Sequence, residues 1–303
     1  MYNSKGKRAL IGAAVTLLAL ILIALIIEFF YLPRYLFGNE KVTPSDHVTD
    51  EVTVMSCNVR YFNPLDLGKR SWFYRARLVA EDVNSVKPDI VGFQEVTWIH
   101  MSYLEDRMQG YDSVNAYRDD FILSEGCPIF YNTKKYTKVS AGSFWISETP
   151  EVMSKIEGAE HYRICVYVIL RDNATGEEIS VFNAHLDNKG ERARELGIGV
   201  VLDKMAELGR GTSILLGDLN DFPDSAPIKI AFENLVDSKS AAFSSDDGAT
   251  YHEWGEDPDH ERIDYVLLSD PAARVYEYRI VDNCHDGVYA SDHNPIYIKF
   301  KTR

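Results

Sequence analysis

The sequence contains few cysteines and no paired-cysteine motif. Its four cysteines, Cys57, Cys127, Cys165 and Cys284, are far apart, and none forms a CxxC pair. This spacing argues against a zinc knuckle. The first three lie in apolar or β-like runs, where cysteine usually packs as a small hydrophobic residue.

Positive charge is also scarce. The chain has 32 Lys and Arg against 46 Asp and Glu, and a formal net charge of −14 at pH 7. This is the wrong sign for a protein that binds nucleic acid mainly by neutralising phosphates. The sequence also has no stripe of Lys and Arg interleaved with aromatic residues, which a processive nucleic-acid binder would show. A phosphate substrate is not excluded, because a bound divalent cation reverses the local field.

A long hydrophobic run dominates the N-terminus. Ala9 to Ile27 are 19 consecutive uncharged, mostly aliphatic positions. As a helix they would be about 28 Å long, close to the hydrocarbon thickness of a bilayer. Basic residues precede the run and aromatic residues follow it, as at a membrane interface: Lys5, Lys7 and Arg8, then Phe29, Phe30 and Tyr31. We therefore predict a transmembrane helix over residues 9–32.

A cleaved signal peptide and a buried core helix are the alternatives to this anchor. A signal peptide usually has a shorter apolar region and small residues at its cleavage site, whereas the bulky stretch EFFYLPRYLF follows here. The basic residues before the run favour a cytoplasmic N-terminus. We therefore predict a single-pass protein of the cell membrane, with a cytoplasmic tail (1–8), a polar linker (33–51) and an extracytoplasmic domain (52–303).

The roughly 250 residues after the linker are enough for one sizeable core. Strand-like runs recur along them, with helix-like segments at Trp72–Val86 and Glu191–Leu208 between some of them. This pattern favours stacked sheets covered by helices, an α/β or α+β layered fold. The strand-like runs are VTVMSCNV, DIVGFQEV, CPIFYN, RICVYVIL, ISVFNAHL, SILLGDLN, IDYVLLS and NPIYIKF.

Nearly every strand-like run ends in a polar group. A carboxylate flanked by Val, Ile, Leu and Phe loses water on folding, which costs several kcal/mol unless the charge is paired. Several such carboxylates on separate strands, with few Lys or Arg nearby, are most simply explained by one shared divalent cation. Oxygen ligands without thiolates suit Mg²⁺ or Mn²⁺ better than Zn²⁺. The end groups include Asn58, Glu95, His185, Asp218, Asn220, Asp264, Asp292 and His293.

The segments that carry these groups resemble the ordered motifs of the endonuclease/exonuclease/phosphatase superfamily. The motifs are CNVRYFN, DIVGFQEV, NAHLD, GDLND, RIDYVLLS and SDHNP, and the resemblance runs from about Val52 to Phe300. Any one motif is weak, but all six in order are specific. The resemblance implies a four-layer αββα sandwich, preceded here by the transmembrane helix, and a hydrolase that uses Mg²⁺ or Mn²⁺.

The resemblance also implies roles for these residues. Asn58 and Glu95 would hold the metal, with Glu95 as the direct carboxylate ligand and Asp292 beside the ion. Asp218 would orient or deprotonate the attacking water, and Asn220 would hydrogen-bond to the phosphate.

Both motif histidines would act on the phosphate. His185 would contact a phosphate oxygen or act near the leaving group. His293 would be the general base or a hydrogen-bond donor, oriented by Asp264. The base is therefore either Asp218 or His293.

Two further residues are candidates for substrate binding. Glu125 stands where several members of the superfamily have an acidic partner of the first histidine, here His185; the alternative is a turn acid before a strand. Arg163 begins a strand and could clamp a phosphate with its guanidinium; the alternative is a surface arginine.

These features predict a membrane-anchored Mg²⁺-dependent phosphoesterase that cleaves a phosphodiester, as a nuclease does, by in-line attack of water. A phospholipid, inositol-phosphate or sphingomyelin-type ester is the alternative substrate, because a membrane tether raises the effective concentration of lipid substrates. A non-catalytic binding module is a third hypothesis, but it would be expected to have lost some of the six polar motifs. The expected partners are the phosphate ester and the membrane; no obligate protein partner is indicated.

Overall fold

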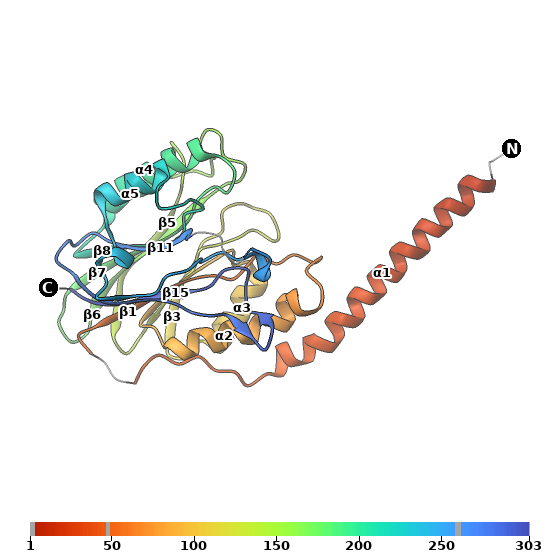
Figure 1. Ribbon diagram of the computed structural model, residues 1–303, viewed down its shortest axis with the longest axis horizontal. Helices are drawn as coiled ribbons and strands as arrows, with labels where there is room; N and C mark the ends of the chain where they lie inside the picture. The colour runs from red at the N-terminus through yellow and green to blue at the C-terminus, as the bar shows by residue number, and fades with distance from the viewer. Residues whose placement is uncertain (1–3, 47–48, 258–261, 303) are drawn as a thin grey trace.

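The computed structural model describes residues 4–46, 49–257 and 262–302. In it, two stacked β-sheets lie between two layers of helices, and a long N-terminal helix extends away from this body (Figure 1). The helices are α1 (Ser4–Phe37), α2 (Trp72–Val86), α3 (Trp98–Arg107), α4 (Glu191–Leu208), α5 (Ala226–Asn234) and α6 (Ser238–Ala241), with 3₁₀ turns η1 (Gly68–Arg70) and η2 (Glu253–Gly255).

The larger sheet has seven strands in the order β10-β12-β15-β1-β2-β4-β3. In it, β1 and β2 are parallel, and β1 and β15 are antiparallel. The strands, in chain order, are β1 (Val52–Asn58), β2 (Ile90–Gln94), β3 (Tyr111–Val114), β4 (Ile129–Asn132), β10 (Ser244–Ser245), β12 (Arg274–Ile280) and β15 (Ile296–Lys301).

The second sheet has six strands in the order β5-β6-β7-β8-β11-β9. In it, β7 and β8 are parallel, and β8 and β11 are antiparallel. The strands are β5 (Tyr136–Trp145), β6 (Ile164–Asp172), β7 (Glu178–His185), β8 (Thr212–Asp218), β9 (Val236–Asp237) and β11 (Asp264–Leu268); β13 (Cys284–His285) and β14 (Val288–Tyr289) form a separate pair.

Side-chain alternation along the strands explains the four layers. Val54 of β1 faces the core between the sheets, whereas its neighbour Met55 faces the core beneath α2 and α3. In the same way, Ile214 of β8 faces the core between the sheets, whereas its neighbour Leu215 packs under α4 and α5. The central strands β1, β2, β7, β8 and β11 therefore have two buried faces, as their continuous apolar sequences predict. The predicted αββα sandwich is confirmed.

The sheets bring the ends of several strands to one edge, which we call the rim. β1, β2, β7 and β8 all end there, and β11 begins there. The register places His185 of β7 and Asp264 of β11 on either side of Asp218. β15 leads to the C-terminus and runs opposite to β1, so the rim is at the end of the sandwich away from the C-terminus (Figure 1).

Helix α1 is long, apolar and exposed. Within it, residues Gly6–Ile26 form the one segment of the described chain that is long and apolar enough to cross a membrane, and none of that segment is buried. The helix begins inside the predicted cytoplasmic tail, of which residues 1–3 lie outside the described chain.

The first part of the predicted linker is helical and packed rather than extended. Tyr35 stacks on Tyr103 and lies edge-on to Phe73, with ring centroids 4.9 and 5.0 Å away. Its hydroxyl donates to the carbonyl of Ile99 (2.9 Å). Further along, the Val42 amide donates to the carbonyl of Arg107 (2.9 Å). Buried apolar contacts therefore fix the base of α1 on α2 and α3; residues 47–48 of the linker lie outside the described chain.

Candidate active site

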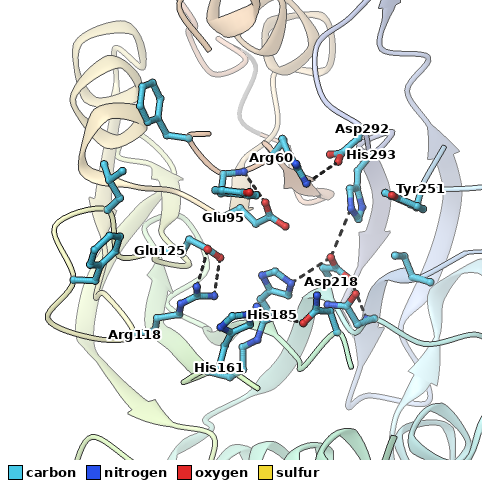
Figure 2. A pocket seen from close by; sticks show the side chains of 18 of the residues that line it. Arg60, Glu95, Arg118, Glu125, His161, His185, Asp218, Tyr251, Asp292 and His293 are labelled. Atoms are coloured by element: carbon cyan, nitrogen blue, oxygen red, sulfur yellow. Dashed lines mark hydrogen bonds and ion pairs between the residues drawn. The ribbon is translucent and has the colours of Figure 1, made fainter. Parts of the chain in front are cut away.

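A cavity of about 760 Å³ opens at the rim. Side chains from both sheets and from the loops between their strands line it (Figure 2). Eight of the ten sequence-predicted residues line the cavity, and Asn58 and Asp264 lie directly behind it: Glu95, Glu125, Arg163, His185, Asp218, Asn220, Asp292 and His293 are the eight.

Two carboxylates from opposite sheets converge on one amide. The side-chain nitrogen of Asn58 donates to Glu95 Oε1 (3.2 Å) and to Asp218 Oδ2 (3.0 Å). Glu95, His185 and Asp218 each offer a ligand atom, and these atoms lie within 4.8 Å of one another. In the described chain, no lysine or arginine forms an ion pair with Glu95 or Asp218. Asp218 is buried and Glu95 is half-buried, so two carboxylates lie close together, away from bulk water, without a Lys or Arg ion pair in the described chain.

The GDLN motif positions Asp218 through its glycine. Gly217 has φ 136°, and a Cβ there would lie 1.9 Å from the carbonyl oxygen of Ala184 on β7. Only glycine permits this close approach of β8 to β7. Glu95 and Asn220 also have positive φ, 64° and 53°. Positive φ is uncommon for residues other than glycine, and such strained conformations cluster at functional sites.

His293 is held in a carboxylate–imidazole pair. Its Nδ1 lies 2.9 Å from Asp264 Oδ2, and its Nε2 lies 3.8 Å from Asp218 Oδ2. Burial opposes the charged imidazole, but the carboxylates of Asp264, Asp218 and Asp292 together outweigh it and raise the pKa of His293 to about 10. His293 is therefore a cationic donor at neutral pH.

The other two groups of this cluster have different charge states. The Nε2 of His185 lies 3.5 Å from Asp218 Oδ2. Burial, and then the positive charge of Arg163, holds the pKa of His185 well below its usual value, so this imidazole is neutral. Burial and the neighbouring Asp264 raise the pKa of Asp218 to about 7.

Asp292 lies on the same side of the cavity but pairs with an arginine. Its Oδ2 is 3.4 Å from Nη1 of Arg60. Arg60 stacks over Tyr61 (4.5 Å to the ring centroid) and lowers the pKa of Glu95 against the effect of burial. In the described chain, the Asp292 carboxylate is thus paired with a protein cation.

The opposite side of the cavity carries a second charged group. Arg118 forms a two-pronged ion pair with Glu125, with both N–O distances 2.8 Å (Figure 2). Glu125 thus pairs with Arg118, and no hydrogen bond joins it to His185 in the described chain. Arg163 is 6% exposed; its Nη2 donates to Asn188 (3.3 Å) and its buried Nε has no hydrogen-bond partner. Arg163 is thus a buried cation in the cavity wall, not a surface arginine.

With this geometry in place, the comparison with known families is decisive. The model of the Endonuclease/Exonuclease/phosphatase family matches residues 55–293. The chain belongs to the endonuclease/exonuclease/phosphatase family. It is therefore a hydrolase of phosphate esters.

Solved structures of this family have the same fold. An endonuclease/exonuclease/phosphatase from Bacteroides vulgatus is 28% identical, with a TM-score of 0.79; the match covers 84% of this chain and 99% of that one. The mannosyl-6-phosphatase of Bacteroides thetaiotaomicron VPI-5482 is 30% identical, with a TM-score of 0.73 over 83% of this chain and 100% of that one.

A curated relative matches over a shorter region. The CCR4-Not complex 3'-5'-exoribonuclease subunit Ccr4 of Neosartorya fischeri is 23% identical over 177 residues. The match covers 49% of this chain and only 23% of the Ccr4 protein.

The residues at the rim fit a divalent metal ion, as expected of this family. Two closely spaced carboxylates without a Lys or Arg partner repel each other unless a cation or a proton lies between them. Their oxygens, with the adjacent imidazole, are suitable metal ligands. Asn58 differs from the sequence expectation in one respect: its nitrogen faces the carboxylates, while its oxygen accepts from the amide of Arg60 (2.9 Å).

Three basic residues that line the cavity are not among the site residues that the sequence predicts: Arg60, Arg118 and His161. Arg60 lies in the motif CNVRYFN, two residues after Asn58, and its positive φ of 57° is not visible in the sequence. Arg118 lies in the loop between β3 and β4, and His161 in the loop between β5 and β6. Arg118 and Glu125 have opposite charges and are seven residues apart, and the Arg118 amide donates to the Glu125 carbonyl where the loop folds back. The spacing and the opposite charges are the sequence signal that could have indicated Arg118.

Proposed function

We propose that this chain is a membrane-anchored, Mg²⁺-dependent phosphoesterase. One observation carries the proposal: the half-buried Glu95 and the buried Asp218 lie side by side, joined by the Asn58 amide, with no Lys or Arg ion pair in the described chain. The oxygen-rich set favours Mg²⁺, or Mn²⁺ in its place. A divalent cation held there would stabilise the charge that develops on the phosphate oxygens.

Asp218 is the group best placed to take a proton from the attacking water. It lies at the centre of the cluster, with His185 and His293 on either side. Its Oδ1 accepts from the backbone amide of Asn220 (2.9 Å), which fixes the carboxylate's orientation. The sequence left the base open between Asp218 and His293; the ion pair with Asp264 favours His293 as a donor, because a protonated imidazole cannot accept a proton.

The remaining cluster residues would bind the phosphate. His293 would donate to a non-bridging or leaving-group oxygen of the phosphate. Asn220 lies two residues after Asp218, just beyond the end of β8, and lines the same cavity. Arg163 supplies a buried guanidinium whose Nε–H has no hydrogen-bond partner in the described chain. A charge-assisted hydrogen bond from such a guanidinium to a phosphate oxygen is strong. Glu125 and Arg118 would set the shape and charge of the opposite cavity wall, which would contact the rest of the substrate.

The first candidate substrate is a phosphodiester of the kind that nucleases cleave, and the alternative is a phosphate ester of a lipid. Relatives include both a mannosyl-6-phosphatase and an exoribonuclease subunit, so the family alone does not choose. The cavity of about 760 Å³ has the size of a small-molecule site rather than of a long nucleic-acid groove.

The membrane anchor is α1, with the N-terminus in the cytoplasm and the catalytic domain outside. This part of the proposal is supported by the exposed apolar segment Gly6–Ile26 and the basic residues before it. In intact cells, an external protease should cleave the domain, and the mature chain should retain residues 9–32. A mature N-terminus after residue 32 would instead establish a cleaved signal peptide.

Turnover on two chromogenic esters tests the activity. The full chain in detergent is assayed on bis-p-nitrophenyl phosphate and p-nitrophenyl phosphate, with Mg²⁺, with Mn²⁺ and with EDTA. We expect metal-dependent turnover, with the ratio between the two esters assigning diester or monoester preference. Absence of metal-dependent turnover on both esters would favour the non-catalytic module.

A further inference from the structure

The exposed apolar side chains of the catalytic domain are concentrated at the rim. Outside α1, the large apolar side chains that stand out into solvent are Leu65, Leu67, Trp98, Tyr117, Phe121, Ile122, Val152, Met153 and Phe243. All but Phe243 lie in segments that join the rim ends of the strands. These segments follow β1 and β2, connect β3 to β4, and connect β5 to β6.

Four of these side chains line the catalytic cavity or adjoin a residue that lines it. Phe121, 67% exposed, lines the cavity itself. Ile122, 74% exposed, follows it, and both line a smaller neighbouring hollow together with Trp98. Leu65, 82% exposed, follows Pro64, which lines the cavity from the other side. A soluble protein rarely gathers apolar groups around one opening unless the opening meets an apolar partner.

The anchor helix leaves the domain from this same end. Tyr35 near the end of α1 packs on Phe73 at the start of α2, and its hydroxyl bonds to Ile99 at the start of α3. Both helices begin at the rim, just after β1 and β2. In Figure 1, α1 extends from the side of the domain opposite the C-terminus, which is the rim side.

The joint is short and packed, so it limits how far the rim can be from a bilayer. The apolar segment ends at Ile26, nine residues before Tyr35, which is about 13 Å of helix. The head-group layer on each side of a bilayer is about 5–8 Å thick. Arg107 Nη2 also bonds to the Tyr35 carbonyl (3.0 Å), which fixes the helix further. The rim is thus held within reach of the head groups.

We propose that the rim side chains Leu65, Trp98, Phe121 and Ile122 enter the head-group layer of the membrane that α1 spans. The cavity mouth then opens onto the bilayer surface, and the site acts on a phosphate ester carried by a membrane lipid. This inference rests on the proposed function and on α1 as an anchor. It selects the lipid alternative over the nucleic-acid one.

Charge on the rim agrees with a neutral lipid surface. Asp119 and Asp120 immediately precede Phe121, and the whole chain is acidic. Insertion would therefore depend on apolar contact, with no attraction to anionic lipids, unlike that of basic surface helices.

Lipid contact can be measured separately from catalysis. The full chain, with Cys284→Ser to remove the least buried thiol, is reconstituted in phosphatidylcholine nanodiscs. An NBD label is placed at Leu65→Cys, at Ile122→Cys or, as the matched control, at Phe243→Cys. Phe243 is 79% exposed but packs beside β12 at the far end, where its amide bonds to Val275.

We expect blue-shifted NBD emission and quenching by doxyl-labelled phosphatidylcholine at positions 65 and 122, and water-like emission at 243. Equal, water-like emission at all three positions overturns the proposal. This readout needs no activity, so it stands even where the chromogenic assay fails and the proposed function is wrong.

Substrate preference is the second test. Phosphatidic acid, phosphatidylcholine and sphingomyelin are compared in nanodiscs with their short-chain soluble forms. We expect at least one disc-borne ester to be cleaved faster than its soluble form. The double variant Leu65→Ser with Ile122→Ser should reduce that disc activity about tenfold, or 1.4 kcal/mol, and leave soluble-ester turnover unchanged. Faster cleavage of every soluble form, or no cleavage of any lipid beside active chromogenic turnover, overturns the lipid assignment.

Discussion

Strands β1 and β2 bury a carboxylate system at each end, and the two systems differ in how the charge is balanced. At the N-terminal end, Asp89 is paired with Lys135 (2.9 Å) and also accepts from the amide of Thr53 (3.0 Å). At the rim, Glu95 and Asp218 share the Asn58 amide donor, each accepts from one backbone amide, and Asp218 also lies beside the imidazoles of His185 and His293. Asp89 is 7% exposed and Asp218 is 1% exposed, so burial alone does not distinguish them.

The difference shows what marks a site in this fold. Lys135 is itself buried, and its ammonium also donates to the carbonyl of Glu51, so the Asp89 system is complete within the chain. At the rim, no lysine or arginine of the described chain pairs with Glu95 or Asp218, and the charged partner of Asp218 is the His293 imidazole, 3.8 Å away. A buried acid paired with a lysine or arginine therefore indicates a structural role, whereas one left with amides and imidazoles is a candidate for chemistry.

Removing the charge of Asp218 should produce the largest effect. For Asp218→Asn we expect turnover to fall by about 10³-fold or more, because both the proton acceptor and a candidate metal ligand are lost. The thermal melt should be unchanged or higher, since carboxylate repulsion with Glu95 is relieved. A melt that collapses together with the activity would make Asp218 a structural residue like Asp89.

The matched change at the other end should have the opposite outcome. Asp89→Asn leaves the Lys135 ammonium buried without its carboxylate, which costs about 3–5 kcal/mol in comparable buried pairs. We expect urea unfolding to show this loss, while turnover per folded molecule stays at the wild-type value. A comparable loss of turnover in the folded fraction would contradict the separation of the two ends.

Metal binding should stabilise only the rim system. At a Mg²⁺ concentration 100 times its Kd, the folded chain should gain about 2.7 kcal/mol. Glu95→Gln should lose this gain, and Asp89→Asn should keep it, as measured by thermal melts with Mg²⁺ or with EDTA. An equal Mg²⁺ shift in the wild type and Glu95→Gln would place the metal elsewhere.

The smallest expected effect is a pH dependence of stability without metal. The folded pKa of His293 is about 10, above its ordinary value of 6.5, so the folded state holds this proton more tightly. The resulting stabilisation is full below about pH 6.5 and is lost as the pH rises towards 10. In EDTA, the melting temperature should therefore fall by several degrees between pH 7.5 and 10. Asp264→Asn should show a smaller fall, and an unchanged slope would count against the ion pair.

The sequence predicted which polar residues gather at the rim for a simple physical reason. Four of the polar motifs directly follow an apolar strand, and strands of a two-sheet sandwich bring their ends together once the layers stack. Asn58, Glu95, His185 and Asp218 needed only this rule. Asp264 begins β11 and His293 precedes β15, so their positions needed the antiparallel pairings of β11 with β8 and of β15 with β1, which the order of motifs implied only through the family resemblance.

Residues whose positions depend on loops were less predictable. Arg118 meets Glu125 because the segment between β3 and β4 folds back on itself, which no periodicity encodes. Tyr35 falls in the predicted linker (33–51), and its local sequence does not indicate a packing partner. Its stacking on Tyr103 depends on long-range packing between α1 and α3, which only the three-dimensional structure shows.

The most direct measurement is anomalous diffraction from crystals of the full chain soaked in Mn²⁺. Our account predicts one anomalous peak between Glu95 and Asp218, about 2.1 Å from a carboxylate oxygen of Glu95. An empty position there in crystals that bind Mn²⁺ only at other residues would contradict the claim that these two carboxylates are held together by an external cation.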